Sequence, residues 1–600
     1  MLDKLSDWLD DRTGYRALVS SALDEEIEGG ARWAYVFGSG LLAIFLCQMV
    51  TGVLLMLTYT PSVNDAWSSV YYIQHQVTGG WFVRGLHHYG AQAMMIVLGM
   101  HLLQVALYGA YKKPREVTWW VGLALLGLVQ GLGLTGYLLP WDQKGYWATK
   151  VATNIAGTVP LVGPSIQTLI VGGADYGQAT ITRFYVLHVA VLPMLLLLTV
   201  TMHVALFRKN GATAPASADR SVKGAFYPDQ VFKDRVCTVL LVGGMALLTA
   251  TTGGGHLDAP ADPSLEYHPR PEWYFLFLFQ LLKYLPGSLE LLGTVVLPGL
   301  AGAFLFALPF FDRGDSRALR GRLPWLAPIF VGGLGVVFLT WQSFQDDAGD
   351  EAFQKSRVAS QQRADRAIEL AANGVPPGGP LEMLRRDPIT RGPDVYAQEC
   401  AGCHILNGEG ERAAPDHTGF GSREWVMGVL IDPDADHYFG TTDIADMKPM
   451  GKLGKAKLDA VTEFVFALGH QEGDPAFDKA LADKGKEVFE NTCMDCHLFE
   501  GDGAHMFDGP DMTAYGSLKW IEGQVRNPDA ESQYGELNEM PAFEGELDDN
   551  DISMVSQYLR LQRFDKPDIL VKPEDIPADE EGAAGGGTAD AGAPDGDGAE

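Results

Sequence analysis

Seven long apolar segments dominate the first 345 residues of this 600-residue chain and limit what it can fold into. About 20 apolar residues cross a bilayer as a helix, in which every backbone polar group is paired within the segment. The segments are 33–58, 81–110, 117–139, 184–207, 234–252, 288–311 and 324–343. The sequence therefore predicts an all-α membrane protein with seven spans and soluble parts. A shorter apolar stretch at 273–285 lies between prolines and is interpreted as an interfacial or re-entrant segment.

The charges of the loops predict how the spans are oriented. Lysine and arginine gather after the second, fourth and sixth spans, whereas 59–80 and 253–269 contain neither. By the positive-inside rule the amino terminus is cytoplasmic, and everything after about residue 345 lies on the outer side. We therefore expect a multi-pass protein of a bacterial inner membrane with a periplasmic carboxy-terminal part. The net charge of −30 argues against a nucleic-acid partner.

Changes in composition predict the domain boundaries. Residues after 345 are first charged and then rich in proline and glycine (NGVPPGGP), and the chain ends in GAAGGGTADAGAPDGDGAE. We expect an amphipathic surface helix at 1–30, a four-span domain at 31–215, a three-span domain at 216–345, a stalk and linker at 346–390, two small helical domains at 391–470 and 480–565, and a disordered acidic tail at 566–600.

The two small domains are an internal repeat with a period of about 93 that carries a CxxCH motif twice. Cys400, Cys403 and His404 recur as Cys493, Cys496 and His497. In this motif two thiols attach to the vinyl groups of haem and the histidine takes the iron. A single copy could arise by chance, but two copies in one repeated frame predict two covalent haems c.

Methionines are the candidates for the sixth iron ligands of these haems. Met540, in NEMPAF, precedes an amphipathic helical stretch, and the first repeat offers Met447 or Met450 in DMKPM. Each repeat has an aromatic residue followed by glycine, Phe439-Gly440 in the first and Tyr534-Gly535 in the second. Counted from this glycine, Met447 is seven residues on and Met450 ten, against five for Met540. Met447 is therefore the preferred ligand, and a surface methionine is the alternative.

The second and fourth spans each contain two widely spaced histidines. His87 and His101 are fourteen positions apart, hence about 21 Å along a helix and within about 40° of one face. His188 and His203 are fifteen positions apart in the fourth span. Both spans run inward, so the pairs His87–His188 and His101–His203 can each hold a haem with no open iron position, which suits electron transfer. The alternative is satisfied core histidines; His88 has no counterpart and is not expected to be a ligand.

Three further positions near the outer histidines could bear chemistry. Arg84 and Arg183 precede these histidines and suit haem propionates, although either could only anchor the interface. Glu272, in Pro-Glu-Trp-Tyr after the fifth span, is a carboxylate among aromatics that could accept a proton from a hydroquinone. A rigid interfacial turn is the alternative for that stretch.

Together these residues make the chain resemble the cytochrome b of the quinol–cytochrome c oxidoreductases (cytochrome bc complexes). The four histidines, GYLLPWDQKGYWA at 136–148, TRFYVLH at 182–188 and the PEWY stretch carry the resemblance, which covers 31–345. It implies a four-helix haem-binding bundle and three further transmembrane helices, followed by two fused monohaem cytochrome c domains. The histidine spacing of the fourth span and the RKNG that follows it resemble the split plastid-type protein, whose separate subunit is joined here in one chain.

The resemblance also implies roles for single residues. Glu272 and Tyr274 would belong to an outer quinol-oxidation site with Tyr137 at its rim, and Arg208 and Asp234 would lie near an inner quinone-reduction site. Four glycines would let the helix backbones pass close to two haems b, namely Gly38, Gly52, Gly122 and Gly136. The plastid-type protein has a cysteine for an extra haem where this chain has Val36, so no third covalent haem is expected.

The implied activity is bifurcated quinol oxidation that contributes to proton-motive force. One electron would go to a Rieske iron–sulfur protein and the other across the membrane to quinone, while the c haems serve a periplasmic cytochrome c or a docked terminal oxidase. The sequence has no paired Cys-x-His motif, so the Rieske protein would be a separate subunit; a homodimeric complex is the family's habit. Ubiquinone and menaquinone both remain open. The competing hypothesis is a membrane-anchored dihaem carrier with a vestigial b part, which would not need four histidines and PEWY.

Overall fold

The computed structural model describes residues 2–265, 267–442, 447–503 and 509–564. The predicted acidic tail lies outside these residues. Contacts within the chain divide it into two compact units, Met1–Met383 and Leu384–Glu600.

The first unit contains the seven predicted spans. Seven helical segments of its described residues are long and apolar enough to cross a membrane, which confirms the sequence prediction: Trp33–Met56, Gly80–Tyr108, Glu116–Tyr137, Gln178–Asn210, Phe226–Thr252, Gly287–Phe311 and Leu319–Gly349. The apolar stretch after the fifth span forms only the short helical segment Trp273–Lys283. Its length is too small for a crossing, as expected.

The spans are built from long α-helices, and several also include a shorter helical turn, such as the π-helical turn Leu292–Val296 of the sixth span. Their main helices are α3 (Val36–Met56), α5 (Gly80–Tyr108), α6 (Glu116–Tyr137), α10 (Leu192–Asn210), α11 (Val231–Thr252), α13 (Leu297–Phe311) and α14 (Leu319–Gly349). The fourth span joins α9 (Gln178–Val186) to α10 through a π-helical turn, Leu187–Val191. Helix α5 lies between Gly79 (φ +74°) and Gly109 (φ +63°), two left-handed positions at which glycine ends a helix without strain.

Shorter elements complete the first unit. They are α1 (Leu2–Thr13), α2 (Tyr15–Leu23), α4 (Ala66–His75), α7 (Gln143–Gly157), α8 (Gly163–Val171), α12 (Leu276–Lys283) and α15 (Glu351–Ala371). Strands β1 (Glu26–Glu28) and β2 (Lys223–Ala225) pair antiparallel with Ile27 opposite Gly224. This pairing ties the amino-terminal segment to the chain just before the fifth span.

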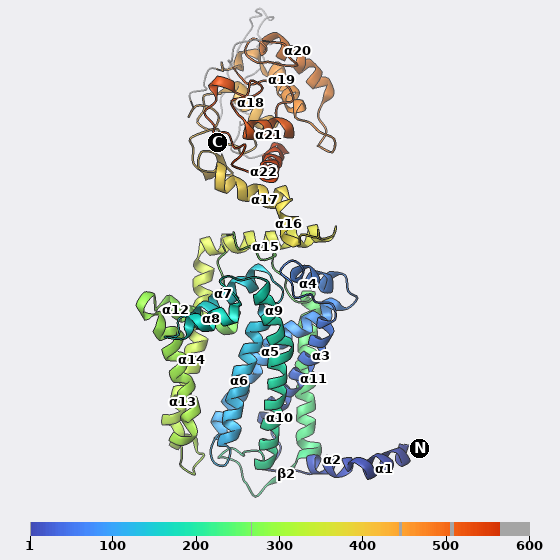
Figure 1. The fold of residues 1–600 in the computed structure, drawn as a ribbon, viewed down its shortest axis with the longest axis vertical. Coiled ribbons are helices and arrows are strands. Elements are labelled where there is room, and N and C mark those ends of the chain that lie inside the picture. The colour runs from blue at the N-terminus through green and yellow to red at the C-terminus, as the bar shows by residue number, and fades with distance from the viewer. Residues whose placement is uncertain (1, 266, 443–446, 504–508, 565–600) are drawn as a thin grey trace, which may run out of the picture. The chain divides into compact units, whose positions relative to one another are not determined.

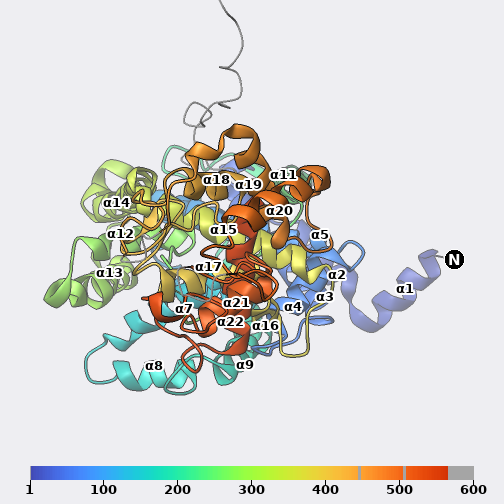
Figure 2. The same cartoon turned by 90° about the horizontal axis from the view of Figure 1, so that it is seen from above.

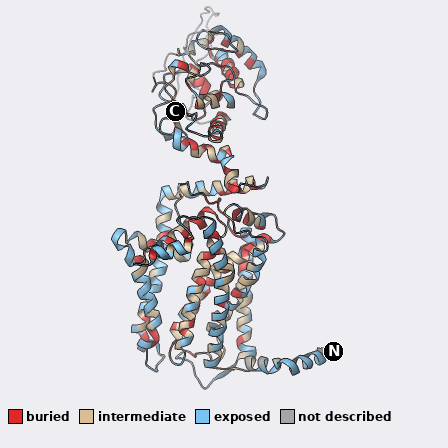
Figure 3. Ribbon diagram, viewed as in Figure 1, coloured by how far each residue is buried: buried red, intermediate tan, exposed pale blue. Residues whose placement is uncertain are grey.

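A bundle of helices forms the core of the first unit. Helix α3 packs on α5, α10 on α6, and α11 on both α3 and α5. The core between them is apolar and includes Ile44, Met94, Val97, Val129 and Leu196. In Figures 1 and 2, α13 and α14 lie together to one side of α3, α5 and α11. Exposed residues line the outward faces of the spans (Figure 3), as expected where lipid replaces water.

A buried ion network joins the four-span part to the last two spans. Asp312 accepts hydrogen bonds from Lys112 Nζ at 2.6 Å, Arg322 Nε at 3.0 Å and Tyr111 Oη at 2.6 Å. Burial alone would raise the pKa of Asp312, but hydrogen bonds from these three residues lower it below its ordinary value. Both cations are almost completely buried, so the carboxylate is their essential counter-charge.

The second unit contains both CxxCH repeats in one hydrophobic core. Its elements are α17 (Pro388–Val395), α18 (Arg423–Ile431), α19 (Lys455–Leu468), α20 (Lys479–Thr492), α21 (Leu518–Arg526), α22 (Asp549–Leu561), β3 (Ile405–Leu406) and β4 (Glu409–Gly410), with α16 (Pro380–Arg385) at the boundary. Trp425 and Phe464 of the first repeat share the core with Phe489 and Trp520 of the second.

The helices of the two repeats are exchanged. Helix α17, which leads into the first CxxCH motif, packs against α22 at the end of the second repeat. Helix α20, which leads into the second motif, packs against α19 at the end of the first repeat. The predicted domains at 391–470 and 480–565 are therefore interleaved in space, although each is a repeat in sequence.

Equivalent local signals start equivalent helices. Ser422 accepts a hydrogen bond from the backbone N–H of Trp425 at 3.0 Å, and Ser517 accepts one from that of Trp520 at 3.2 Å. Each serine is the N-cap of its helix, α18 or α21, and satisfies one backbone donor that the helix leaves free.

Candidate functional site

The four predicted histidines meet in two pairs inside the bundle. The ring centroids of His87 and His188 are 6.2 Å apart, and those of His101 and His203 are 6.5 Å apart. Two iron–nitrogen bonds of about 2 Å each would take up roughly 4 Å of such a separation, and the two rings take up the rest. The pairs therefore fit bis-imidazole haem sites, one near each end of the same helices.

The π-helical turn explains why the histidine spacing differs between the two spans. His87 and His101 both lie on the unbroken helix α5. His188 lies within the π turn Leu187–Val191, and such a turn accommodates an extra residue in an otherwise α-helical segment. The interval from His188 to His203 is correspondingly longer by a single position than that from His87 to His101. The extra residue is absorbed locally, so both histidines of the fourth span still face those of α5.

Threonines orient the rings of the first pair. Thr51 Oγ1 lies 2.9 Å from His87 Nδ1, and Thr135 Oγ1 lies 3.2 Å from His188 Nδ1. With Nδ1 engaged in a hydrogen bond, Nε2 of each ring is left for a metal. These threonines were not predicted from the sequence, although each directly precedes a glycine that was.

The four glycines named from the sequence each lie against one histidine ring. An added Cβ would come within 3.7 Å of the ring of His101 at Gly38, 3.3 Å of His87 at Gly52, 3.3 Å of His203 at Gly122, and 2.5 Å of His188 at Gly136. Gly136 leaves the least room. The absence of side chains here lets the rings occupy the space between the helices.

The two arginines are held by backbone carbonyls. Arg84 is buried and donates to the carbonyls of Gly255 and His256 and to Gln74 Oε1. Arg183 donates to the carbonyl of Leu169. Both are fixed on the helices that carry His87 and His188, and a role toward propionates stays a prediction.

Glu272 has charged and polar partners that come from other parts of the chain. Its Oε1 pairs with Lys144 Nζ at 2.9 Å, and its Oε2 accepts from Gln92 Nε2 at 3.1 Å. Burial alone would raise the pKa of this carboxyl, but the Lys144 charge and the two hydrogen bonds hold the pKa below its ordinary value, aided by His88. Lys144 belongs to the GYLLPWDQKGYWA stretch that carries the family resemblance, but its charge pairing was not anticipated.

The two tyrosines lie beside Glu272. The Tyr137 ring is 5.7 Å from Lys144 Nζ, and its buried hydroxyl has no hydrogen-bond partner among the described residues. Burial raises the pKa of Tyr274, and the negative charge of Glu272 raises it further. The arrangement groups a carboxylate and two phenols near the end of the bundle that holds His87 and His188, where a hydroquinone could hydrogen-bond.

The residues expected at the inner end have protein partners. Arg208 Nη1 pairs with Glu25 at 2.6 Å, and Asp234 accepts from Gln230 Nε2 at 3.0 Å. Arg208 also lies 5.4 Å from the ring of Phe226. A quinone site there stays a prediction.

The histidines of both CxxCH motifs are oriented alike in the second unit. His404 Nδ1 donates to the Pro415 carbonyl at 2.8 Å, and His497 Nδ1 donates to the Pro510 carbonyl at 3.0 Å. This leaves Nε2 for iron. The first cysteine of each motif is buried and the second exposed: Cys400 and Cys493 against Cys403 and Cys496.

A second histidine accompanies the first motif. The rings of His404 and His417 stack with centroids 4.0 Å apart, and His417 Nδ1 lies 3.2 Å from the Tyr396 hydroxyl. Burial holds the pKa of His417 well below its ordinary value. The backbone N–H of His417 donates to the carbonyl of Ile405, the residue after His404, and that of Met512 donates to the carbonyl of Leu498, the residue after His497. Met512 is therefore the equivalent of His417 in the second repeat. Because a methionine stands there, the repeat pattern did not point to His417.

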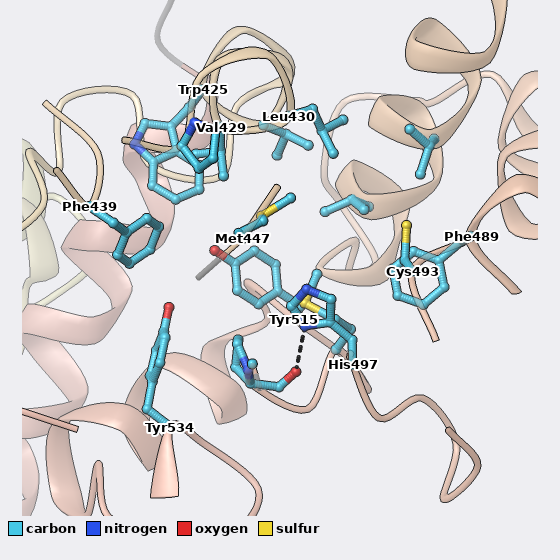
Figure 4. A pocket seen from close by; sticks show the side chains of 17 residues that line it. Trp425, Val429, Leu430, Phe439, Met447, Phe489, Cys493, His497, Tyr515 and Tyr534 are labelled. Atoms are coloured by element: carbon cyan, nitrogen blue, oxygen red, sulfur yellow. Dashed lines mark hydrogen bonds between the residues drawn. The ribbon is translucent and has the colours of Figure 1, made fainter. Parts of the chain in front are cut away.

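The candidate axial methionines lie in different surroundings. Met447 borders a cavity with an empty volume of about 840 Å³, part of it open to solvent, together with His497 and Cys493 (Figure 4). Met540 Sδ accepts a weak hydrogen bond from Gln524 at 3.8 Å. The interval from Met447 to Met540 equals that from Cys400 to Cys493, so the two methionines are equivalent in the repeat.

Family models match most of the chain. Residues 24–211 match the model described as cytochrome b/b6/petB, and residues 261–355 match cytochrome b(C-terminal)/b6/petD. Residues 389–468 match cytochrome c, and residues 480–559 match cytochrome C oxidase, cbb3-type, subunit III.

Individual proteins are similar to the membrane part. The menaquinol:cytochrome c reductase cytochrome b subunit of Geobacillus thermodenitrificans is 40% identical over 223 residues, 36% of this chain and 100% of the relative. The cytochrome b6 of a Synechococcus strain is 41% identical over 214 residues, 36% of this chain and 100% of the relative. A solved structure described as a hyperthermophilic respiratory Complex III has a TM-score of 0.50 and 25% identity, covering 61% of this chain and 97% of that one.

Proposed function

Because this chain belongs to the cytochrome b/b6 family and carries cytochrome c domains behind its membrane part, we propose that it is the membrane subunit of a quinol:cytochrome c oxidoreductase. His87 with His188 and His101 with His203 would hold two haems b. Cys400, Cys403 and His404, and their equivalents in the second repeat, would hold two covalent haems c. These groups would supply one-electron carriers with no open iron position.

Glu272 is the residue that we propose takes part in quinol oxidation. Its carboxylate is partly buried beside Tyr274 and Tyr137, and the charge of Lys144 favours its ionised form, so it can take a proton from a hydroquinone as electrons leave. The ion pair with Lys144 must loosen for this, and Lys144 can move because its side chain is 39% exposed. The two electrons would part at this site, one to a separate Rieske protein and the other toward the outer histidine pair.

The inner end of the bundle would complete the reaction. Quinone reduction near Arg208 and Asp234 on the cytoplasmic side would move charge across the membrane and contribute to proton-motive force. The orientation rests on the loop charges, which put the c domains in the periplasm of a bacterial inner membrane. There they would pass electrons to a cytochrome c or to a terminal oxidase, within a homodimeric complex.

The observation that carries this proposal is the combination of two histidine pairs, 6.2 and 6.5 Å between ring centroids, with Glu272 at the outer end of the same bundle. A mere membrane anchor for the c domains needs neither.

Replacing Glu272 with Gln tests the proposal. The amide keeps the shape but cannot accept the proton, so quinol:cytochrome c turnover should fall on the order of a hundredfold, the low end for acid–base catalysis. Pyridine-haemochrome analysis should still find two b and two c haems. Glu290→Gln, at an exposed glutamate near the start of the sixth span, is the matched control and should leave turnover unchanged. Undiminished turnover in Glu272→Gln would support the anchored dihaem carrier instead.

A further inference from the structure

The helix exchange in the second unit brings each CxxCH motif against the end of the other repeat. If each repeat folded on itself, α17 would pack on α19 and α20 on α22. The observed partners are α22 for α17 and α19 for α20. The helix that precedes each motif therefore takes its long partner helix from the other repeat.

Two equivalent glycines make these exchanged contacts close. Gly392 and Gly485 occupy the same position ahead of the first cysteine of their motifs. A Cβ on Gly392 would overlap Tyr558 of α22, and a Cβ on Gly485 would lie 2.7 Å from Cβ of Phe464 of α19. Both backbones thus approach a helix of the other repeat more closely than any larger residue allows.

An ion pair stabilises the contact between α17 and α22. Arg391 Nε lies 2.7 Å from Asp551 Oδ1, and its Nη2 lies 2.5 Å from Oδ2, so the two groups pair through both oxygens. Arg391 is in α17 and Asp551 is in α22. A two-point contact of this kind fixes direction as well as distance.

The cavity of Figure 4 combines the two repeats in the same way. Its described lining takes Phe489, Cys493 and His497 from the second repeat. From the first repeat it takes Met447 and residues of α18 and α19, such as Trp425, Leu430, Val461 and Val465. This apolar chamber holds the proximal histidine of the second motif and the candidate methionine of the first.

Further residues at equivalent positions meet at the same cavity. Phe439 and Tyr534 each come six positions after a proline, Pro433 in the first repeat and Pro528 in the second. Both rings line the cavity, with their centroids 6.4 Å apart. The two repeats are therefore related as interlocking halves, and the same relation that brings Met447 to the cavity of His497 is expected to bring Met540 to His404.

We propose that the two c haem sites are formed across the repeats: Met447 is the axial ligand of the iron held by His497, and Met540 that of the iron held by His404. This rests on the proposed function insofar as both motifs must carry haem. The site of His497 then takes Met447 and residues of α18 and α19 from the first repeat, and the site of His404 takes Met540 from the second. The assignment replaces the expectation, drawn from the repeat alone, that Met447 serves His404 and Met540 serves His497.

A spectral label on one haem tests this pairing in the full-length holoprotein. Cys493→Ala leaves attachment through Cys496 alone, so one vinyl group stays conjugated and moves the absorption of that haem to longer wavelength. Met447→His is then added, and both bands are followed in a redox titration. Histidine in place of methionine lowers the reduction potential.

The expected result is a lower midpoint potential for the labelled haem and an unchanged one for the other. Met540→His in the same background should change only the unlabelled haem. The opposite assignment of the two shifts would overturn the proposal. Met450→His is the matched control, since Met450 is close to Met447 in sequence and does not border the described cavity; both potentials should stay unchanged.

Two safeguards keep the outcome interpretable. Mass analysis for covalent haem comes first, and absence of haem from either motif would contradict the proposed function rather than the pairing. If the labelled variant fails to accumulate, Cys400→Ala labels the other haem, and Met540→His must then shift the labelled band.

Discussion

Lys144 sets the protonation of Glu272, and removing its charge should shift the pH dependence of turnover. Burial is the largest single influence on the pKa of Glu272 and raises it, but Lys144, 2.9 Å away, together with Gln92 and His88 outweighs burial and lowers the pKa below its ordinary value. Lys144→Met removes the charge but keeps an unbranched side chain. The pKa of Glu272 should then rise, because burial is opposed only by Gln92 and His88.

The size of the shift follows from distance and exposure. An opposite charge this close lowers a carboxyl pKa by about 1 to 3 units. The Lys144 side chain is 39% exposed and that of Glu272 11%, so water screens the pair from one side and the low end applies. We therefore expect the pKa of Glu272 to rise by no more than the loss of a partly exposed ion pair allows, which is worth up to about 1 kcal/mol.

The assay is quinol:cytochrome c turnover of the purified complex across the acidic to neutral range. Glu272 works as a base only when ionised, so turnover is lost as pH falls through its pKa. A raised pKa moves this acid limb to higher pH. Lys150→Met, which removes a lysine 4.6 Å from the Trp147 ring on the same helix, is the control. An acid limb that stays in place or moves to lower pH would refute the reasoning.

Two further substitutions test the membrane part. Asp312→Ala leaves Lys112 and Arg322 buried without a counter-charge, so the unfolding free energy should fall by about 3–5 kcal/mol, measured by thermal denaturation in detergent. Gly136→Ala places a Cβ 2.5 Å from the His188 ring, which must move, so one of the two b-type components should lose or change its spectrum in a redox titration. Asp315→Ala, at an exposed carboxylate, is the control for Asp312→Ala and should leave the denaturation midpoint unchanged. An equal loss of stability in both variants would mean that the buried ion network does not stabilise the fold more than an exposed carboxylate does. Gly127→Ala is the control for Gly136→Ala, because it adds a methyl group to α6 where nothing lies within 4 Å, and both b-type components should persist. If both components also persist unchanged in Gly136→Ala, the close approach to His188 does not restrict this position.

The membrane site was predictable because periodicity on a helix fixes which side chains share a face. The spacing of His87 and His101 makes them point nearly the same way, and a matching pair on a second span leaves few arrangements. The interval from His188 to His203 is one residue longer, and the sequence did not show how both histidines still face those of α5. The π turn at Leu187–Val191 keeps them aligned, and such a turn depends on packing. Sequence reasoning also named Glu272 but not Gln92 or Lys144, since side chains 180 and 128 residues away in sequence carry no periodic signal.

The organisation of the second unit was predictable only in part. Repeats reveal that Gly392 and Gly485, or Met447 and Met540, play equal roles, and the family models match each repeat separately. They do not reveal which copy each residue contacts, because both pairings satisfy the same pattern. Only the packing of α17 on α22 and of α20 on α19 distinguishes them.

The exchanged helices also have a consequence for the order of assembly. Only the short segment 469–478 separates α19 from α20, whereas nearly the whole unit, 396–548, separates α17 from α22. Loop-closure entropy makes the distant pair costlier to bring together by roughly 2 kcal/mol, and contacts between nearby segments form faster. The α19–α20 hairpin is therefore expected to form first, and α17 must wait for the last helix of the unit to emerge. The first CxxCH motif, synthesised earlier, would be the later of the two to acquire its complete surroundings.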